Sequence, residues 1–222
     1  MSPFQISRPT PAIARLLPWL ALVVAIVLPG RAAAQATNRW TGGGDGTTWN
    51  QSANWQLGRT PIASDVAIID LNGTNTVVRI AGISAAVRSL TSTATLVLDS
   101  GELSVSQGTN HLTGPLHASF SGIGASGNGT RLVATNTTTL VGTSFNAIGG
   151  ATLRLTGARR FIASDRGNVS VVARNPGSAV ELPNVTEFAG ATGRFQSLTV
   201  NAINGGGIQL GKSDRKKEEV AR

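Results

Sequence analysis

The sequence predicts an all-β protein, most of it a right-handed parallel β-helix or a related β-solenoid. Residues 37–211 contain many short runs in which apolar and polar residues alternate, with almost no helical periodicity. One stretch repeats at an offset of 28 to 29 residues, from Val171 to Val200 and from Val180 to Ile208. Aromatic residues make up only 5% of the chain, so we expect a core of small stacked side chains without an aromatic centre. A β-sandwich is the alternative architecture.

Residues 1–36 predict an export signal. Arg8 and Arg15 precede an apolar run at 16–28, and small residues follow it at Ala34 and Ala36. The run is shorter than the roughly 20 residues that a membrane span needs. We therefore expect cleavage between Ala36 and Thr37 and no stable membrane span afterwards, with an uncleaved anchor as the alternative. The mature protein is then secreted or held in the cell envelope.

Residues 37–70 are predicted to cap the solenoid at its N-terminal end. Three of the four tryptophans lie here, Trp40, Trp49 and Trp55, around a GGGDG turn. The first coil of a solenoid exposes an apolar end, and large rings can cover it and block edge-to-edge growth. The pair Asp45 and Gly46 favours a tight turn, and we expect Asn54 to bond a neighbouring main chain.

Two other interpretations of the same segment predict binding. An indole offers a wide apolar face, so Trp40, Trp49 and Trp55 are possible stacking partners for sugar rings. Asp45, Asp65 and Asp70 carry oxygen ligands of the kind that Ca²⁺ prefers. The spacing of a calcium loop is absent, however, and we predict neither a metal site nor a cofactor.

The segment from 39 to 70 also resembles the start of large secreted bacterial proteins with parallel β-helix or autotransporter-passenger-like repeats, which are common in planctomycete and related envelope proteomes. Its W-x-x-x-x-N-W element is typical of that group. The resemblance implies an architecture and export, and it implies no activity. The matching residues are Trp40, Gly43, Asp45, Gly46, Trp49, Asn54, Trp55, Pro61, Asp65, Ile68 and Asp70.

Residues 71–211 are predicted to form the solenoid repeats. A period in the high twenties corresponds to two or three short strands and gives roughly six coils over this length. A weaker T-L-x-L echo links Thr95–Leu98 with Thr152–Leu155. Glycine and asparagine are expected at left-handed corners, as in SGEL at 100–103 and NGGG at 204–207. The clearest strands are NTVVRI, TATLVLD, GELSVS, TRLVATN, TTLVG, ATLRLTG, VSVVAR, AVELP, SLTVNA and GIQLG.

Residues 212–222 form a charged tail that we predict to be disordered. All lysines of the chain lie there, at Lys212, Lys216 and Lys217. The formal net charge of +8 falls to +5 when three arginines leave with the signal, because 16 basic residues then face 11 acidic ones. The basic residues of the body are scattered and form no stripe, so nucleic acid is not an expected partner. Surface glycans or other envelope proteins fit better.

Candidate catalytic groups are sparse, and we predict a protein that is not an enzyme. Asp99 and Glu102 could serve as acid and base but flank a Ser-Gly turn. His111 and His117 have neither metal-ligand nor triad spacing. No motif fixes a loose set of charged residues, which comprises Arg154, Arg159, Arg160 and Asp165.

The expected function is that of an exported structural or adhesive surface protein whose solenoid displays polar faces. One alternative is a carbohydrate-active enzyme of the polysaccharide lyase or hydrolase type. The other is a glycan-binding module that uses the tryptophans.

Overall fold

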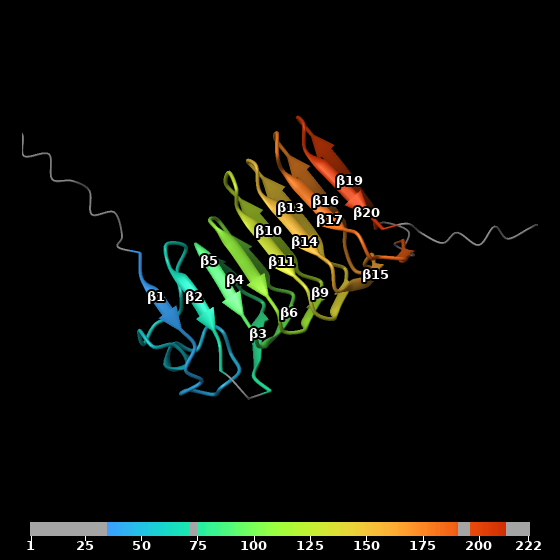
Figure 1. The fold of residues 1–222 in the computed structure, drawn as a ribbon. Helices are drawn as coiled ribbons and strands as arrows, with labels where there is room; N and C mark the ends of the chain where they lie inside the picture. The colour runs from blue at the N-terminus through green and yellow to red at the C-terminus, as the bar shows by residue number, and fades with distance from the viewer. Residues whose placement is uncertain (1–34, 72–74, 191–195, 212–222) are drawn as a thin grey trace, which may run out of the picture. The chain divides into compact units, whose positions relative to one another are not determined.

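The computed structural model describes residues 35–71, 75–190 and 196–211, and most of them lie in short β-strands (Figure 1). Within these residues the strands form three sheets, and neighbouring strands are parallel in every pair. A single 3-10 turn, η1 (Ser52–Asn54), interrupts them. The strands are β1 (Thr37–Arg39), β2 (Val66–Ile69), β3 (Val77–Ala81), β4 (Ser84–Val87), β5 (Ser89–Ser92), β6 (Thr95–Asp99), β7 (Glu102–Val105), β8 (Thr109–Leu112), β9 (Leu116–Ser119), β10 (Gly122–Ser126), β11 (Arg131–Ala134), β12 (Thr138–Val141), β13 (Ser144–Ile148), β14 (Thr152–Leu155), β15 (Ala158–Ile162), β16 (Val169–Arg174), β17 (Ala179–Leu182), β18 (Glu187–Ala189), β19 (Leu198–Ile203) and β20 (Gly207–Leu210).

The chain winds as a β-solenoid. From β3 onward, three consecutive strands contribute one strand to each sheet, and the chain then returns to the first sheet. We call the sheet β3-β6-β9-β12-β15-β18 sheet 1, the sheet β4-β7-β10-β13-β16-β19 sheet 2, and the sheet β1-β2-β5-β8-β11-β14-β17-β20 sheet 3. Along sheet 1 the path makes about five turns, and Figure 1 shows the coils stacked in sequence order. The predicted solenoid is confirmed, and the sandwich alternative is wrong.

The core consists of alternate residues that point inward from every sheet. In β6, for example, Leu96 and Leu98 are buried while Val97 is half-buried and Asp99 is exposed. Each inward residue lies beside its equivalent in the next coil, as Leu96 does beside Leu116. All ten strands proposed from the sequence are present. The buried residues form one continuous core that includes the three tryptophans.

The repeat at 171–210 is confirmed in register, but its period does not extend through the whole body. Val171 pairs with Val200 and Val180 pairs with Ile208, as the sequence comparison predicted. Earlier coils are shorter: Ser84 pairs with Glu102, an offset of only 18 residues. The T-L-x-L echo was wrong, since β6 belongs to sheet 1 and β14 to sheet 3.

The coils of the C-terminal half contain more residues, and phenylalanine lies in their core. Phe145 and Phe161 are fully buried, with ring centroids 6.0 Å apart, and Phe188 lies 4.9 Å from Phe161. The prediction of a core without aromatic residues was therefore wrong for these coils. A longer coil has a larger cross-section, which small side chains alone would leave poorly packed.

One corner repeats in a left-handed conformation from coil to coil. Between sheets 1 and 2, Gly82, Ser100, Phe120 and Gly142 all have positive φ, from 51° to 63°. The predicted corner at 100–103 is present, but Ser100 and not Gly101 adopts the left-handed angle. Gly101 is needed for another reason, because a Cβ there would lie 2.5 Å from the Ile80 carbonyl oxygen of the previous coil.

The predicted signal peptide and charged tail fall outside the described residues, apart from Gln35 and Ala36. The Ala36 carbonyl accepts a hydrogen bond of 2.8 Å from the Val66 N–H, and the first strand begins at Thr37. Across the described ranges, no helix has the length and apolar character of a membrane span.

Candidate functional site

The three tryptophans of the N-terminal segment form one buried cluster. Trp40, Trp49 and Trp55 are 3%, 1% and 2% exposed. Trp55 lies at the centre, with its ring edge-to-face against Trp40 at 5.0 Å and against Trp49 at 4.8 Å. Its indole N–H donates a 2.7 Å hydrogen bond to the Trp49 carbonyl. Edge-to-face packing of this kind adds to the stabilisation that burial itself gives.

The segment around the cluster closes two sheet edges at the N-terminal end. Residues 54–56 fold back against β1 in the antiparallel sense, with a Trp40–Trp55 bridge and a 2.8 Å bond from the Gln56 N–H to the Arg39 carbonyl. Thr48 pairs with Arg79 of β3, the first strand of sheet 1. Because these backbone groups are bonded within the chain, the edges of β1 and β3 cannot template another strand there. The predicted Trp-rich cap is present.

The cap boundary differs in detail from the prediction of 37–70. β1 and β2, which fall within that range, are regular strands of sheet 3 and continue the stack toward the N-terminus. The part that folds across the end is the stretch from Trp40 to Asp65.

The GGGDG turn is held by Asn54, as predicted. The Asn54 side-chain oxygen accepts hydrogen bonds from the N–H groups of Gly44 and Gly46 at 2.9 and 3.0 Å. Its amide donates to the Asp45 carboxylate at 2.7 Å and to the Thr48 carbonyl at 2.9 Å. Asn54 is fully buried, and all four of its hydrogen-bonding positions are used.

Asp45 serves the turn as an acceptor. Its carboxylate accepts the N–H groups of Thr47 and Thr48 at 2.9 and 2.8 Å. Hydrogen bonds from Thr48, from the Thr47 N–H and from the Asn54 amide hold the pKa of Asp45 well below its usual range.

Asp65 is buried and forms an ion pair with Arg59. Two hydrogen bonds join the Arg59 guanidinium to the carboxylate, one of them 2.9 Å from Nη2 to Oδ1, and the Ile62 N–H adds another at 2.9 Å. The Arg59 hydrogen bond lowers the pKa of Asp65 against the opposing effect of burial. Asp70 is exposed and accepts a bond from Thr93. These partners leave the three aspartates apart, and no group of three metal-binding side chains comes together in the described residues.

Burial of the indoles removes the surface that glycan stacking requires. A stacking platform presents a ring face to solvent, whereas Trp40, Trp49 and Trp55 are all at most 3% exposed. The hypothesis that they bind sugar rings does not fit this geometry, and the cluster belongs to the core. The indole nitrogens of Trp40 and Trp49 are buried without a hydrogen-bond partner in the described residues.

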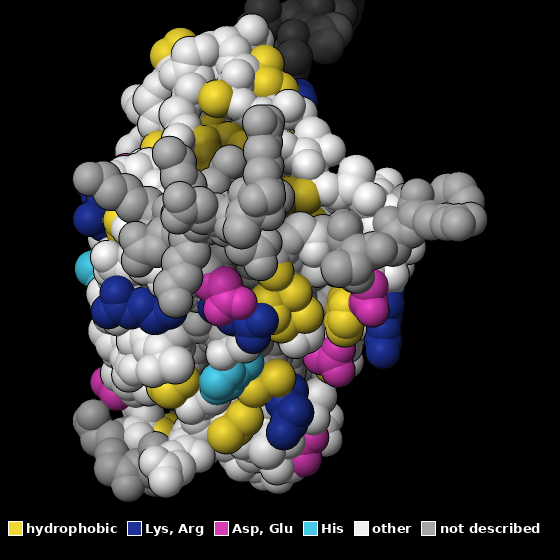
Figure 2. Space-filling model, turned by 90° about the vertical axis from the view of Figure 1, so that its right-hand side faces the viewer, with side chains coloured by type: hydrophobic (Ala, Val, Ile, Leu, Met, Phe, Trp, Pro, Cys, Tyr) yellow, Lys and Arg dark blue, Asp and Glu magenta, His cyan; other side chains and the backbone are white. Residues whose placement is uncertain are grey.

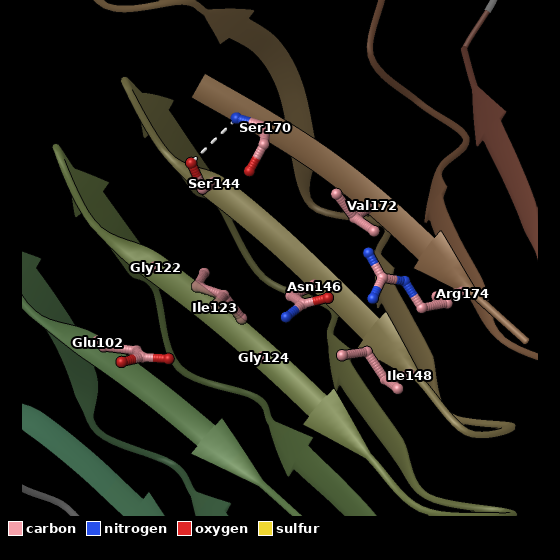
Figure 3. A pocket seen from close by; sticks show the side chains of 10 residues that line it. All are labelled: Glu102, Gly122, Ile123, Gly124, Ser144, Asn146, Ile148, Ser170, Val172 and Arg174. Atoms are coloured by element: carbon pink, nitrogen blue, oxygen red, sulfur yellow. Dashed lines mark hydrogen bonds between the residues drawn. The ribbon is translucent and has the colours of Figure 1, made fainter. Parts of the chain in front are cut away.

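A groove lies on a different surface, the outward face of sheet 2. The groove, of about 320 Å³, crosses β7, β10, β13 and β16 (Figure 3). This volume lies at the lower end of the range of about 300 to 1,000 Å³ that is typical of ligand sites. Its outward-pointing lining combines polar and charged residues with two apolar ones: Glu102, Gly122, Gly124, Ser144, Asn146, Ile148, Ser170, Val172 and Arg174.

Two glycines form the floor of this groove. Gly122 and Gly124 take outward positions on β10, between Glu102 and Ser104 on one side and Ser144 and Asn146 on the other. Neither has a positive φ. A Cβ at Gly124 would lie 3.4 Å from the Ser104 Cβ, which is ordinary contact. The backbone therefore does not require glycine at Gly124, and glycine within a strand often marks close approach of a ligand or another backbone.

The side chains around the floor are hydrogen-bonding groups together with two aliphatic ones, Ile148 and Val172. Figure 3 shows Glu102 and Arg174 toward opposite ends of the groove, with Asn146 between them. The Ser144 hydroxyl already accepts a 3.1 Å bond from the Ser170 N–H, and Glu102 accepts one of 3.2 Å from Ser84. Hydroxyl and amide groups both donate and accept, which suits a polar, polyhydroxylated ligand. The signal for the groove in the sequence is the pair of outward glycines in GIGAS, which do not by themselves predict a site.

The other candidate residues do not converge. Asp99 ends β6 and Glu102 begins β7, on two sides of the Ser100 corner, so they are a solvated turn as expected. His111 lies on sheet 3 and His117 on sheet 1, where its Nδ1 lies 3.3 Å from the Thr139 hydroxyl.

Of the loose set Arg154, Arg159, Arg160 and Asp165, two arginines form ion pairs across neighbouring strands. Arg154 pairs with Glu181 on sheet 3, and the Arg160 Nε lies 2.7 Å from Glu187 on sheet 1. Arg159 and Asp165 are exposed. The candidates for acid, base or anion binding are thus spread over different faces.

In comparisons with known proteins, no family model, no curated protein and no solved structure matches the chain.

Proposed function

We propose that this chain is a non-catalytic exported protein that acts as a structural or adhesive element of a bacterial surface and binds envelope glycan in the groove of sheet 2. The observation that carries the proposal is the glycine floor of Gly122 and Gly124, whose rim combines hydroxyl, amide and charged side chains with the apolar Ile148 and Val172. Export is supported by the composition of residues 1–36.

The architecture suits an adhesive role because the groove is built on regular strands. Each lining residue lies on a strand that is hydrogen-bonded on both sides, and the residues beneath, such as Leu103, Ile123 and Phe145, are at most 1% exposed. A rigid site loses little conformational entropy when a ligand binds. Extended sugar chains can follow the polar positions that recur from coil to coil.

The test is to fill the floor of the groove. Wild-type protein and a double variant, Gly122→Val with Gly124→Val, are screened for retention on immobilised bacterial envelope polysaccharides. We expect wild-type to be retained and the double variant to lose affinity at least tenfold, because two valine side chains occupy the space of the ligand. A Cβ at Gly122 would lie 3.2 Å from the Glu102 Cγ, so that flexible side chain has to shift, but valine favours extended backbone and the variant should stay folded at the assay temperature.

The matched control is Ala86→Val on β4, which points outward on the same sheet but does not line the groove. It should bind as wild-type does. Equal retention of all three proteins would contradict the groove as the binding site. Release of new reducing ends from any polysaccharide, if purified wild-type does so, would contradict the non-catalytic assignment.

A further inference from the structure

The corners between sheets 1 and 2 differ in length along the solenoid. The first four, which follow β3, β6, β9 and β12, contain two residues each, whereas the fifth, which follows β15, contains the six residues 163–168. The short corners are joined by backbone hydrogen bonds from coil to coil, as from the Phe120 N–H to the Val141 carbonyl at 2.8 Å. The long corner and the short ones together line a pocket of about 350 Å³.

Phe120 occupies one of the short corners in a conformation that a bulky residue rarely adopts. Its φ is 51°, and the residues with positive φ in the other short corners are the small Gly82, Ser100 and Gly142. A left-handed backbone angle is costly for a large side chain, and such strained residues cluster at ligand sites and active sites. A Cβ at Gly142 would lie 2.9 Å from the Phe120 Cδ1, so the ring packs closely on that glycine. Phe120 is half-buried and lines the pocket.

Arg166 extends from the long corner over the Phe120 ring. Its guanidinium carbon lies 4.9 Å from the ring centroid, and its backbone N–H donates a 2.8 Å bond to the Ser164 hydroxyl. Stacking on an aromatic face holds the plane of a guanidinium in one orientation. Among the residues that the structure describes, no carboxylate pairs with Arg166 and no acceptor bonds its guanidinium. An oriented cation with N–H groups to donate therefore lines the pocket.

Asn168 adds a second donor to the pocket. Its side-chain oxygen accepts bonds from the Ser197 N–H and hydroxyl at 3.0 and 3.2 Å, which leaves its NH₂ group to donate elsewhere. The exposed Asp99 and Asp165 are near in sequence but do not line the pocket. On the face shown in Figure 2, basic and acidic side chains lie interspersed, without a continuous patch of one sign. An anion site on this protein therefore needs a local arrangement such as this pocket.

We propose that the pocket between Phe120 and Arg166 binds a carboxylate-bearing sugar unit, at a site separate from the groove of sheet 2. The Arg166 guanidinium meets the carboxylate with two parallel N–H···O bonds, and the Asn168 amide donates to a further oxygen of the ligand. The exposed part of the Phe120 ring packs against the sugar ring. The volume of about 350 Å³ lies at the lower end of the range of about 300 to 1,000 Å³ for ligand sites, which suits a short part of a glycan chain.

The test is calorimetric titration of the full chain with a glucuronic acid trisaccharide, compared with the glucose trisaccharide of the same linkage and with inorganic phosphate. We expect the acidic trisaccharide to bind more tightly than either of the others. Arg166→Lys keeps the charge but loses the paired N–H groups and the stacking, so affinity should fall about tenfold or more. The matched control is Arg159→Lys, at an exposed arginine outside the pocket, and it should bind as wild-type does.

Phe120→Gly separates a binding role from a structural one. Glycine adopts the left-handed angle without strain, as it does in two other corners of the series, so the variant should stay folded in circular dichroism while affinity falls about tenfold. Gly124→Val, in the groove, should leave the affinity for the acidic trisaccharide unchanged, which distinguishes this site from the groove.

Four results would each overturn the proposal. They are equal affinity for the two trisaccharides, phosphate binding as tight as that of the acidic sugar, wild-type affinity in Arg166→Lys or in a folded Phe120→Gly protein, and loss of the acidic sugar in Gly124→Val alone.

Discussion

Single residues of the cap act mainly by satisfying backbone groups. Asn54 holds two N–H groups and one carbonyl of the GGGDG turn and donates to the Asp45 carboxylate. The sequence indicated this role because asparagine commonly bonds nearby main chain. It could not indicate the partners of Asp65, since the Arg59 pair depends on how the chain folds back after Trp55. The prediction that the three tryptophans belong to the cap was correct. It rested on the scarcity of other large side chains in the remaining sequence.

Replacing Asn54 with aspartate should destabilise the protein more than its small change in size suggests. Asn54→Asp loses both donated bonds and sets a carboxylate against Asp45, whose Oδ1 now lies 2.7 Å from the Asn54 amide. We expect a loss of about 3 kcal/mol in the free energy of unfolding, measured by urea denaturation. Asn50→Asp, at an exposed position of the same segment, is the control and should change it by less than about 0.5 kcal/mol. Equal effects of the two substitutions would show that the Asn54 bonds contribute nothing.

The acidic residues of the cap predict a stability that depends on pH. Hydrogen bonds lower the folded-state pKa of Asp45 and of Asp65 below the unfolded value of about 3.9. A lowered carboxyl pKa contributes stability that is complete above the unfolded pKa and is lost as pH falls through the folded pKa. We expect the melting temperature to be level near neutral pH and to fall below about pH 4. Asp65→Asn should lower it at pH 7 and flatten the acid limb, and an acid limb unchanged in this variant would rule out Asp65 as its source.

At the scale of the element, the sequence predicted strands most clearly where β-branched and apolar residues alternate with polar ones. The ten strands found in advance hold inward pairs such as Leu96 and Leu98. Strands such as β4 (SAAV), β8 (TNHL) and β10 (GIGAS) were missed, because Ala, Asn and Ser occupy inward or neighbouring positions there and β-propensity is low. In β8 the inward Asn110 is fully buried and bonds the Leu90 N–H and three backbone carbonyls. Only the stacked neighbours make such a residue acceptable inside a core.

Close stacking of the corners predicts which glycines tolerate no side chain. A Cβ at Gly157 would lie 1.5 Å from the Asn136 carbonyl oxygen, so the two coils would have to separate. Gly157→Ala should reduce the free energy of unfolding by about 3 kcal/mol or more. Gly167→Ala meets nothing within 4 Å and serves as the control, with an expected change near zero. A Gly157→Ala protein as stable as wild-type would show that these coils are not packed as described.

For the whole molecule, the repeated stack was predictable and its variation was not. The sequence repeat aligns Val171 with Val200, and the same two residues pair between β16 and β19. The number of residues per coil grows from 18, between Ser84 and Glu102, to 29, between Val171 and Val200. No repeated motif in the sequence predicts this change in coil length. The groove of sheet 2 also escaped prediction, because its lining comes from four strands that only the coil register brings side by side. The proposed binding site therefore depends on registers that a single strand does not encode.

The proposal that the cap is structural and the groove of sheet 2 binds glycan is tested most directly by comparing two variants for retention on the same immobilised envelope polysaccharide. Trp55→Phe removes the indole bond to Trp49 within the cap, and Gly124→Val fills the groove. Assayed at a temperature where both are folded, Trp55→Phe should bind as wild-type does although it melts at a lower temperature, and Gly124→Val should lose retention without loss of stability. Lost retention in a folded Trp55→Phe protein, together with full retention by Gly124→Val, would contradict this account.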